Sequence, residues 1–179
     1  MLPVRNGTSA NIAAYDPSWP ALFQLEARRL QDGLCDLAYR VEHVGSTSVP
    51  GLAAKPIIDM LVVTENTSDA LECTAQLERL GYTHAEHPIA FFHQPIQWPH
   101  THHIHVREAG HADACRWLLF RDWLRTHPRD LRAYETLKRS LANGADLSRA
   151  EDRARYSEAK TEFIRDVERR AGLARRFGV

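Results

Sequence analysis

The segment Pro56–Val63 constrains the fold most, because it is apolar at almost every position. A strand with one face in water alternates apolar and polar residues, whereas a strand covered on both faces is apolar throughout. This run therefore predicts a central strand with other layers packed on both of its sides. Its one interruption is Asp59, whose carboxylate is costly in such a strand unless it is paired or bound to a cation.

Helices and further strands are expected around this central strand. The expected elements are a helix that Ser18 caps and Gly33 weakens, a strand over Ala38–Val44, a helix capped by Ser68 that ends at Gly81, short strands near Tyr82–Glu86 and Ile89–Gln94, a strand over Thr101–Glu108, and helices over Ala112–Thr126, Pro128–Leu141 and Leu147–Arg170. Because the late strands follow each other through short turns, a mixed sheet is favoured over a purely parallel one.

The pattern as a whole predicts an α/β (α+β) protein with flanking helices and a helical C-terminal third. We expect a flexible N-terminal segment over residues 1–14, one domain over 15–170 and a C-terminal tail over 171–179, which is either an interface or disordered.

Composition limits the classes of partner. The chain has 23 basic and 23 acidic side chains and a pI near 7.2. No global positive field draws in nucleic acid or an anionic membrane, so any anion binding has to be local. Three widely spaced cysteines, an N-terminus without a signal pattern and the absence of a long apolar run predict a cytoplasmic protein with free thiols. Lysines are rare, and only Lys55, Lys138 and Lys160 are present.

The segment from His43 to Asp59 is the strongest candidate for chemistry. A predicted strand leads into the loop Gly45-Ser46-Thr47-Ser-Val-Pro-Gly, then Lys55, and then the strand that carries Asp59. Glycine lets a backbone approach a ligand closely, hydroxyls donate hydrogen bonds, and a lysine supplies a point charge for phosphate. The pattern GxxxxGK[ST] is missing, so this is not a P-loop. A plain turn between two strands is the alternative.

The same run, Gly-Ser-Thr-Ser-Val-Pro-Gly-Leu-Ala-Ala-Lys-Pro-Ile-Ile-Asp, resembles the signature of the GrpB (UPF0157) family. Later stretches resemble that family in the same order: His103-Ile-His105-Val, Leu-Phe-Arg121-Asp122-Trp123-Leu-Arg125, Tyr134-x-x-Leu-Lys138 and Tyr156-x-x-Ala-Lys160-x-x-Phe163-Ile164. The resemblance covers Tyr15 to about Arg170. It implies a nucleotidyltransferase-like fold, because the family is grouped with that superfamily.

Members of that superfamily typically carry a Gly-Ser at a helix start and, roughly a dozen residues later, an Asp-x-Asp/Glu pair on a strand. Here twelve residues separate Gly45-Ser46 from Asp59, which agrees, but Leu61 stands where the second carboxylate is expected. Paired carboxylates position two metal ions for phosphoryl transfer. The missing partner puts standard nucleotidyl transfer in doubt.

Two histidines on a later strand are candidate metal ligands. His103 and His105 are two residues apart, so both project from one face of the predicted strand. With Asp59 they make a two-His-one-carboxylate set suited to Mn, Fe, Zn or Ni rather than to Mg alone. His43 is a further candidate ligand, and a divalent metal (Mg, Mn or Zn) is the expected cofactor. A polar pocket without metal is the alternative, because four of the ten histidines crowd residues 100–105.

The helical third offers a second set of candidate phosphate ligands. Arg121 and Arg125 are one helical turn apart, as are Tyr156 and Lys160. With Lys138, they are expected to neutralise phosphate charge if they converge on the Gly-Ser loop. Exposed faces with local ion pairs are the alternative.

These residues predict a nucleotide- or phosphate-binding protein, with an atypical metal-dependent nucleotidyltransferase as the catalytic version. In that version Asp59, His103 and His105 are the catalytic residues. The alternative is a non-catalytic accessory module on a degenerate transferase fold. Because the family also occurs fused to dephospho-CoA kinase, the resemblance implies a link to coenzyme A metabolism. A metal-dependent hydrolase is a third and weaker interpretation, because no general base is evident beside the histidines.

Overall fold

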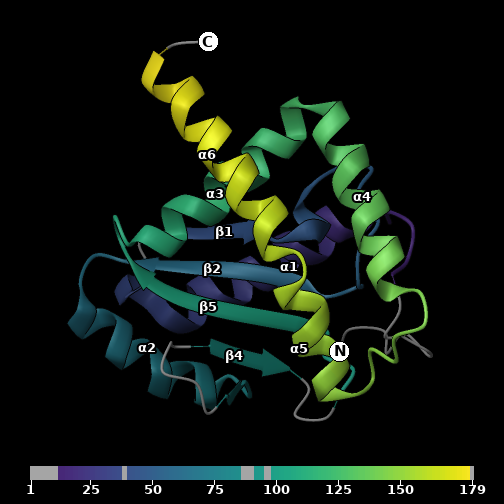
Figure 1. Ribbon diagram of the computed structural model, residues 1–179. Helices are drawn as coiled ribbons and strands as arrows, with labels where there is room; N and C mark the ends of the chain where they lie inside the picture. Colours follow the sequence, from purple (N-terminus) through teal and green to yellow (C-terminus); the bar gives the residue numbers. More distant parts are fainter. Residues whose placement is uncertain (1–11, 38–39, 86–90, 95–97, 178–179) are drawn as a thin grey trace.

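The computed structural model describes residues 12–37, 40–85, 91–94 and 98–177 (Figure 1). Its main elements are α1 (Trp19–Leu34), β1 (Arg40–Val44), β2 (Ile58–Thr64), α2 (Thr67–Arg79), β3 (Thr83–His84), β4 (Phe91–Gln94), β5 (His102–Glu108), α3 (Ala112–Thr126), α4 (Pro128–Ala142), α5 (Ala150–Glu158) and α6 (Thr161–Phe177). A short 3₁₀ turn, Ser46–Ser48, follows β1.

The strands form one mixed sheet in the order β1-β2-β5-β4-β3. The central neighbours β2 and β5 run parallel, and the other pairs are antiparallel. This arrangement confirms the mixed α/β sheet expected from the short turns between the late strands. It also confirms that the apolar run around Asp59 is an inner strand.

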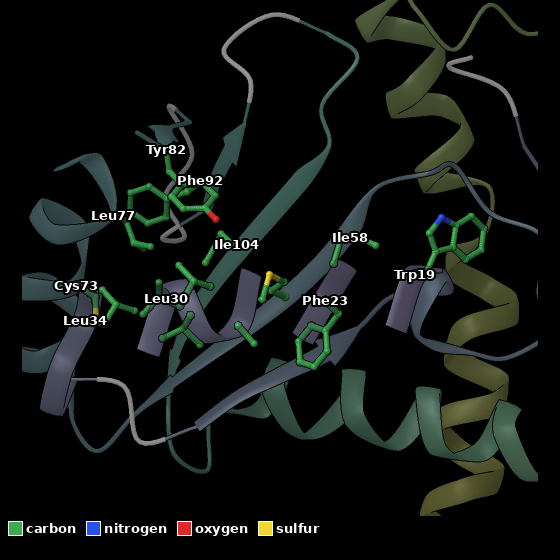
Figure 2. Close-up of a cluster of buried hydrophobic side chains, with 14 of the residues drawn as sticks. Trp19, Phe23, Leu30, Leu34, Ile58, Cys73, Leu77, Tyr82, Phe92 and Ile104 are labelled. Atoms are coloured by element: carbon green, nitrogen blue, oxygen red, sulfur yellow. The ribbon is translucent and has the colours of Figure 1, made fainter. Parts of the chain in front are cut away.

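One face of the sheet packs against α1 and α2 (Figure 1). Ile58, Met60 and Val62 of β2 point to this side and are almost fully buried. Each such side chain stabilises the fold by roughly 1.5–3 kcal/mol relative to an exposed one. Figure 2 shows this core, to which the helices contribute Trp19, Phe23, Leu30, Leu34, Cys73 and Leu77.

The opposite face lies under the C-terminal helices. Ala114, Trp117 and Leu118 of α3 pack against Val44, Leu61 and Val63 of the sheet. A third apolar cluster joins the end of α3 to α4 and α6. It contains Phe120, Trp123, Leu124, Tyr134, Phe163 and Ile164, so the aromatic residues of this region serve packing, as their helical spacing predicts.

Three expectations about helix ends were wrong. Ser18 stands at the N-cap position of α1, but its side chain makes no capping hydrogen bond there. The side chain of Asn66, rather than that of Ser68, caps α2 by accepting a hydrogen bond from the Asp69 backbone N–H at 3.0 Å. An asparagine at this position reaches the third helical amide, whereas Ser68 already lies inside the first turn.

The helix expected over residues 147–170 is divided into α5 and α6, with Ala159 and Lys160 between them. Neither glycine nor proline marks this break, so the periodicity alone runs straight through it. Past the expected end, α6 continues to Phe177, so most of the expected tail is helical. The flexible segment expected over 1–14 lies largely outside the described residues. None of the described helices is long and apolar enough to cross a membrane.

Candidate functional site

Asp59, His103 and His105 lie on the sheet face that is turned toward α3 and α6. In the parallel pairing of β2 with β5, Asp59 is opposite His103 and Leu61 is opposite His105. Residues paired in this way share a face, and side chains two apart along a strand point to the same side. The structure thus brings together the three residues that the sequence singled out on these strands.

The turn after β1 places Gly45 directly against Asp59. Gly45 has φ +68°, a conformation that glycine adopts without strain. A Cβ at this position would lie 2.3 Å from Oδ2 of Asp59. The backbone can therefore approach the carboxylate closely only because residue 45 is glycine. Ser46, the next residue, is hydrogen-bonded to Tyr134 of α4.

A cavity of about 520 Å³ opens between this turn, the sheet and the helices. Its volume falls within the range of about 300–1,000 Å³ that is usual for small-molecule sites. The sheet and turn supply Val44, Gly45, Ser46, Val49, Asp59 and His105; α3 supplies Arg116, Trp117, Phe120, Arg121 and Leu124; Tyr134 comes from α4; and Ser157, Lys160, Thr161, Ile164 and Glu168 come from α5, α6 and the joint between them.

All three lysines of the chain lie around Asp59. Lys160 lines the cavity, and its Nζ lies 4.1 Å from the centroid of the Tyr156 ring. Lys55 approaches the same ring at 4.9 Å. Lys138, which is 2% exposed, donates a hydrogen bond from Nζ to the Ala53 carbonyl. Within the described ranges, the ammonium groups of Lys55 and Lys160 make neither a hydrogen bond nor an ion pair.

The lysines perturb one another because they are close and shielded from water. Burial lowers the pKa of Lys160 to about 8; the charge of Lys55 adds to this effect and that of Asp59 opposes it. Burial, with the charge of Lys160 added, holds the pKa of Lys138 well below its usual range. Burial also lowers the pKa of Lys55. Glu168 is already paired with Arg116, so Asp59 is the main counter-charge of the cluster, and the remaining positive charge attracts an anion.

A chain of hydrogen bonds leads away from Asp59. Nδ1 of His103 donates to Oδ1 of Asp59 at 3.1 Å, and Nε2 of His103 pairs with Nδ1 of His100 at 3.0 Å. Burial favours the neutral acid, but the His103 hydrogen bond and the nearby imidazoles outweigh it and lower the pKa of Asp59. Burial also lowers the pKa of His105 to about 4, so this imidazole is neutral at pH 7.

These groups do not fit a divalent cation. Nδ1 of His103 carries the proton that it donates to Asp59, and Nε2, which holds the one lone pair of the ring, is hydrogen-bonded to His100. Asp59 is the carboxylate that is hydrogen-bonded to His103, and the lysines repel a cation. Across the described residues, no group of three or more His, Cys, Asp and Glu side chains is placed to hold a metal ion. We derive no chemical step through a metal.

His43 is separated from the other expected metal ligands. Val44 is the residue of β1 paired with Asp59, so His43 projects from the opposite face. There its ring stacks on Phe23 at 4.6 Å and its Nε2 lies 3.0 Å from Oγ1 of Thr47. Thr47, 1% exposed, donates to the Ile57 carbonyl. Both residues hold the turn in place instead of facing the cavity.

Arg121 and Arg125 do converge on the turn, but they bind protein groups there. Arg121 pairs with Glu42 at 2.7 Å and donates to the His43 carbonyl at 2.9 Å. Arg125 donates to the Ser48 carbonyl at 2.7 Å. These bonds fasten α3 to the turn, so the two arginines position the site and are not free cations. The ring of Tyr156 also binds protein groups, because the ammonium groups of Lys55 and Lys160 lie against it.

The sequence did not point to Tyr134 as a cavity residue, nor to the pair formed by Arg116 and Glu168. Nε of Arg116 donates to Oε2 of Glu168 at 2.9 Å, joining α3 to α6 at the cavity wall. These residues are 52 positions apart. A local sequence pattern cannot indicate a pair so far apart along the chain.

Comparisons with known proteins agree with this architecture. A family model described as GrpB protein matches residues 9–170. A UPF0157 protein from Halalkalibacterium halodurans is 39% identical over 168 residues, which cover 93% of this chain and 84% of that protein. A crystal structure of the conserved protein GrpB from Enterococcus faecalis is similar with a TM-score of 0.76 and 34% identity, covering 89% of this chain and 96% of that one.

One further relative is a longer protein. A dephospho-CoA kinase from Mycolicibacterium paratuberculosis is 34% identical across 87% of this chain, but the match covers 44% of the kinase. The similarity therefore concerns one part of that protein.

Proposed function

The chain belongs to the GrpB family, and on that premise we propose that the cavity binds the phosphate of a nucleotide or another phosphorylated small molecule. The nucleotidyltransferase-like fold implied by the signature is the scaffold of this proposal. In it, Gly45 permits close approach, Ser46 and Tyr134 offer hydroxyls, and Lys160 supplies positive charge.

The arrangement of the lysines is the observation that carries the proposal. Lys55 and Lys160 contact the Tyr156 ring, but among the described residues their ammonium groups have no hydrogen-bonding or ionic partner, and a shielded cation in that state is costly. The chain therefore gains little stability by gathering its three lysines around Asp59. A phosphate beside Lys160 and Lys55 supplies the missing counter-charge and accepts charge-assisted hydrogen bonds. Because the chain as a whole has no net charge, this attraction is local to the cavity.

Two versions of the proposal differ in chemistry. In the catalytic version the protein is an atypical nucleotidyltransferase, with Asp59 held by His103 beside the reacting phosphate. In the second version it is a binding or accessory module without turnover. Leu61, in place of a second carboxylate, favours the second version. The similarity to part of a dephospho-CoA kinase supports a ligand from coenzyme A metabolism.

A thermal-shift panel tests the phosphate site. Nucleoside triphosphates, dephospho-CoA, phosphorylated sugars and tripolyphosphate are compared, each with and without Mg²⁺ and Mn²⁺. A ligand that binds the folded state raises the melting temperature in a dose-dependent way. We expect a shift that Lys160→Met abolishes and that Arg155→Met, an exposed change on α5, preserves. No shift with any phosphate, or equal shifts in both variants, contradicts the proposal.

Turnover separates the two versions. Release of labelled pyrophosphate from a nucleoside triphosphate, lost in Asp59→Asn, supports the transferase. Tight binding without release supports the accessory module. Binding of Mn²⁺ to the protein without any nucleotide, measured by calorimetric titration and lost in Asp59→Asn, contradicts the conclusion that these side chains do not fit a divalent cation.

A further inference from the structure

Lys160 combines two features that make a lysine reactive. It lies between α5 and α6 and lines the cavity, and its Nζ lies 4.1 Å from the centroid of the Tyr156 ring. In the described part of the chain, that ammonium group has neither a hydrogen bond nor an ion pair. A second ammonium group on the same ring, that of Lys55 at 4.9 Å, places a like charge nearby. Shielding from water and an adjacent cation are the two arrangements that turn a lysine into a nucleophile.

The neutral amine is the reactive form of a lysine, and this environment increases its share. Burial lowers the pKa of Lys160 from 10.5 to about 8; the charge of Lys55 adds to this effect and that of Asp59 opposes it. At pH 7, about one Lys160 side chain in ten is then neutral, against roughly one in three thousand for an ordinary lysine. A less basic amine is also a weaker nucleophile, so part of this gain is offset. A net advantage of about tenfold remains.

The walls around Lys160 suit a reaction that expels water. Val49, Leu124 and Ile164 line the cavity together with its polar groups. Apolar walls limit the access of water, so a product that water hydrolyses is protected there. The volume of about 520 Å³ leaves room for the carbon chain of a small ligand beside its phosphate.

Resting on the phosphate site proposed above, we infer that Lys160 forms an imine with a small phosphorylated aldehyde or ketone. The ammonium group releases one proton, and the neutral amine attacks the carbonyl carbon, so that a C–N bond forms while the π electrons of the C=O bond move to oxygen. The oxygen takes up that proton and one amine hydrogen and leaves as water, and the nitrogen lone pair forms the second C–N bond. A protonated imine results. Its positive charge stays beside the phosphate of the ligand, and the step needs no other reactant.

Reductive trapping on the whole chain tests the inference. Sodium cyanoborohydride reduces an imine to a stable secondary amine, and mass spectrometry of the digested protein identifies the modified positions. Because all three lysines of the chain surround Asp59, Arg155→Lys supplies a reference amine at a side chain that is 74% exposed. If that variant fails to fold, Nα-acetyl-lysine amide in the same reaction with the wild-type protein is the reference.

Glycolaldehyde phosphate at pH 7 is the probe, and glycolaldehyde is the matched probe without a phosphate. We expect glycolaldehyde phosphate to modify position 160 about tenfold or more faster than the reference amine. A shielded lysine without enhanced reactivity would react more slowly than an exposed one. The ratio is expected to be smaller with glycolaldehyde, which the phosphate site does not hold. Saturating tripolyphosphate should slow the modification at position 160 and leave that of the reference amine unchanged.

Three results overturn the inference: modification at position 160 no faster than at the reference amine, the same ratio for the two aldehydes, or a rate at position 160 that tripolyphosphate does not change. In each case, calorimetric titration of tripolyphosphate reports separately on the proposed function. Binding that Lys160→Met weakens leaves the phosphate site intact, with Lys160 acting as a charge and not as a nucleophile. If tripolyphosphate fails to bind as well, both the inference and the proposed function are overturned.

Discussion

The two faces of the sheet use the same strands for opposite purposes. Toward α1 and α2, β2 presents Ile58, Met60 and Val62, which belong to a continuous apolar core (Figure 2). Toward α3 and α6, the alternate positions of the same strand include Asp59, beside the histidines of β5 and below a cavity. Because side chains alternate along a strand, one strand can stabilise the fold on one side and carry a ligand site on the other.

The difference between the two faces of the sheet indicates which substitutions change the stability of the fold and which change ligand binding. Substitutions on the core face are expected to change the free energy of unfolding and leave the ligand affinity alone. Removing a charge on the cavity face is expected to lower the ligand affinity and to raise the free energy of unfolding, because charges held there for binding weaken the fold.

The largest effect is expected from the core face. Leu30→Ala empties a fully buried position on α1 and should lower the free energy of unfolding by about 2–5 kcal/mol. Urea denaturation measures this change. Leu71→Ala, at a side chain that is 72% exposed, is the control and should stay within about 0.5 kcal/mol. If folded Leu30→Ala protein loses affinity for tripolyphosphate, the claim that the core face does not affect ligand binding is contradicted.

Gly45→Ala probes the point where the turn meets Asp59. The added Cβ meets Oδ2 of Asp59, and the residue must keep φ +68°, so we expect a cost of about 1–3 kcal/mol together with weaker binding. Gly51→Ala is the matched control, because φ is +81° there but no atom lies within 4 Å of the new Cβ. Its cost in urea denaturation should be smaller. If both substitutions lower the free energy of unfolding equally, the contact between residue 45 and Asp59 does not contribute to the loss.

Lys160→Met should separate stability from binding in the opposite direction to Leu30→Ala. Removing an unpaired, shielded ammonium group is expected to raise the free energy of unfolding by about 1 kcal/mol. Tripolyphosphate affinity should fall by about tenfold or more, because a charge-assisted hydrogen bond is lost. Calorimetric titration and urea denaturation on one sample measure both. A variant that is less stable than the wild type contradicts the electrostatic interpretation.

The last prediction concerns pH. Lys160 has a pKa of about 8 in the folded protein and an unfolded value near 10.5. Between these values the unfolded chain binds more protons, so the contribution of Lys160 to stability rises with pH from about 8 to 10.5. We measure it as the difference between wild type and Lys160→Met, which cancels groups common to both. The stability advantage of the variant should shrink across that window, and a constant difference contradicts the lowered pKa.

Local patterns predicted the framework well. The run around Asp59 is the expected inner strand, and α3 has the expected bounds, Ala112–Thr126. The common face of His103 and His105 also followed from period-two alternation, whereas the place of Asp59 beside them depends on the register of β2 and β5. The separation of His43 needed one more fact, the pairing of Val44 with Asp59, which depends on strand register.

Contacts between distant segments were out of reach of local patterns. Arg121 was expected to face a phosphate but binds Glu42, which is 79 residues away. The gathering of the three lysines depends on α4, the α5–α6 joint and the loop before β2 meeting in space. The segment between α5 and α6 contains neither glycine nor proline. The helical periodicity therefore did not indicate a break there, and it did not place Lys160 between two helices.

Lysine footprinting tests the central claim most directly, because the chain offers only three lysines to map. The protein is acetylated with limiting acetic anhydride, with and without saturating tripolyphosphate, and the modified peptides are quantified by mass spectrometry. We predict that tripolyphosphate protects Lys160 most and Lys55 next, while the buried Lys138 reacts slowly in both samples. Unchanged acetylation of Lys160 under saturating tripolyphosphate would contradict a phosphate site in this cavity.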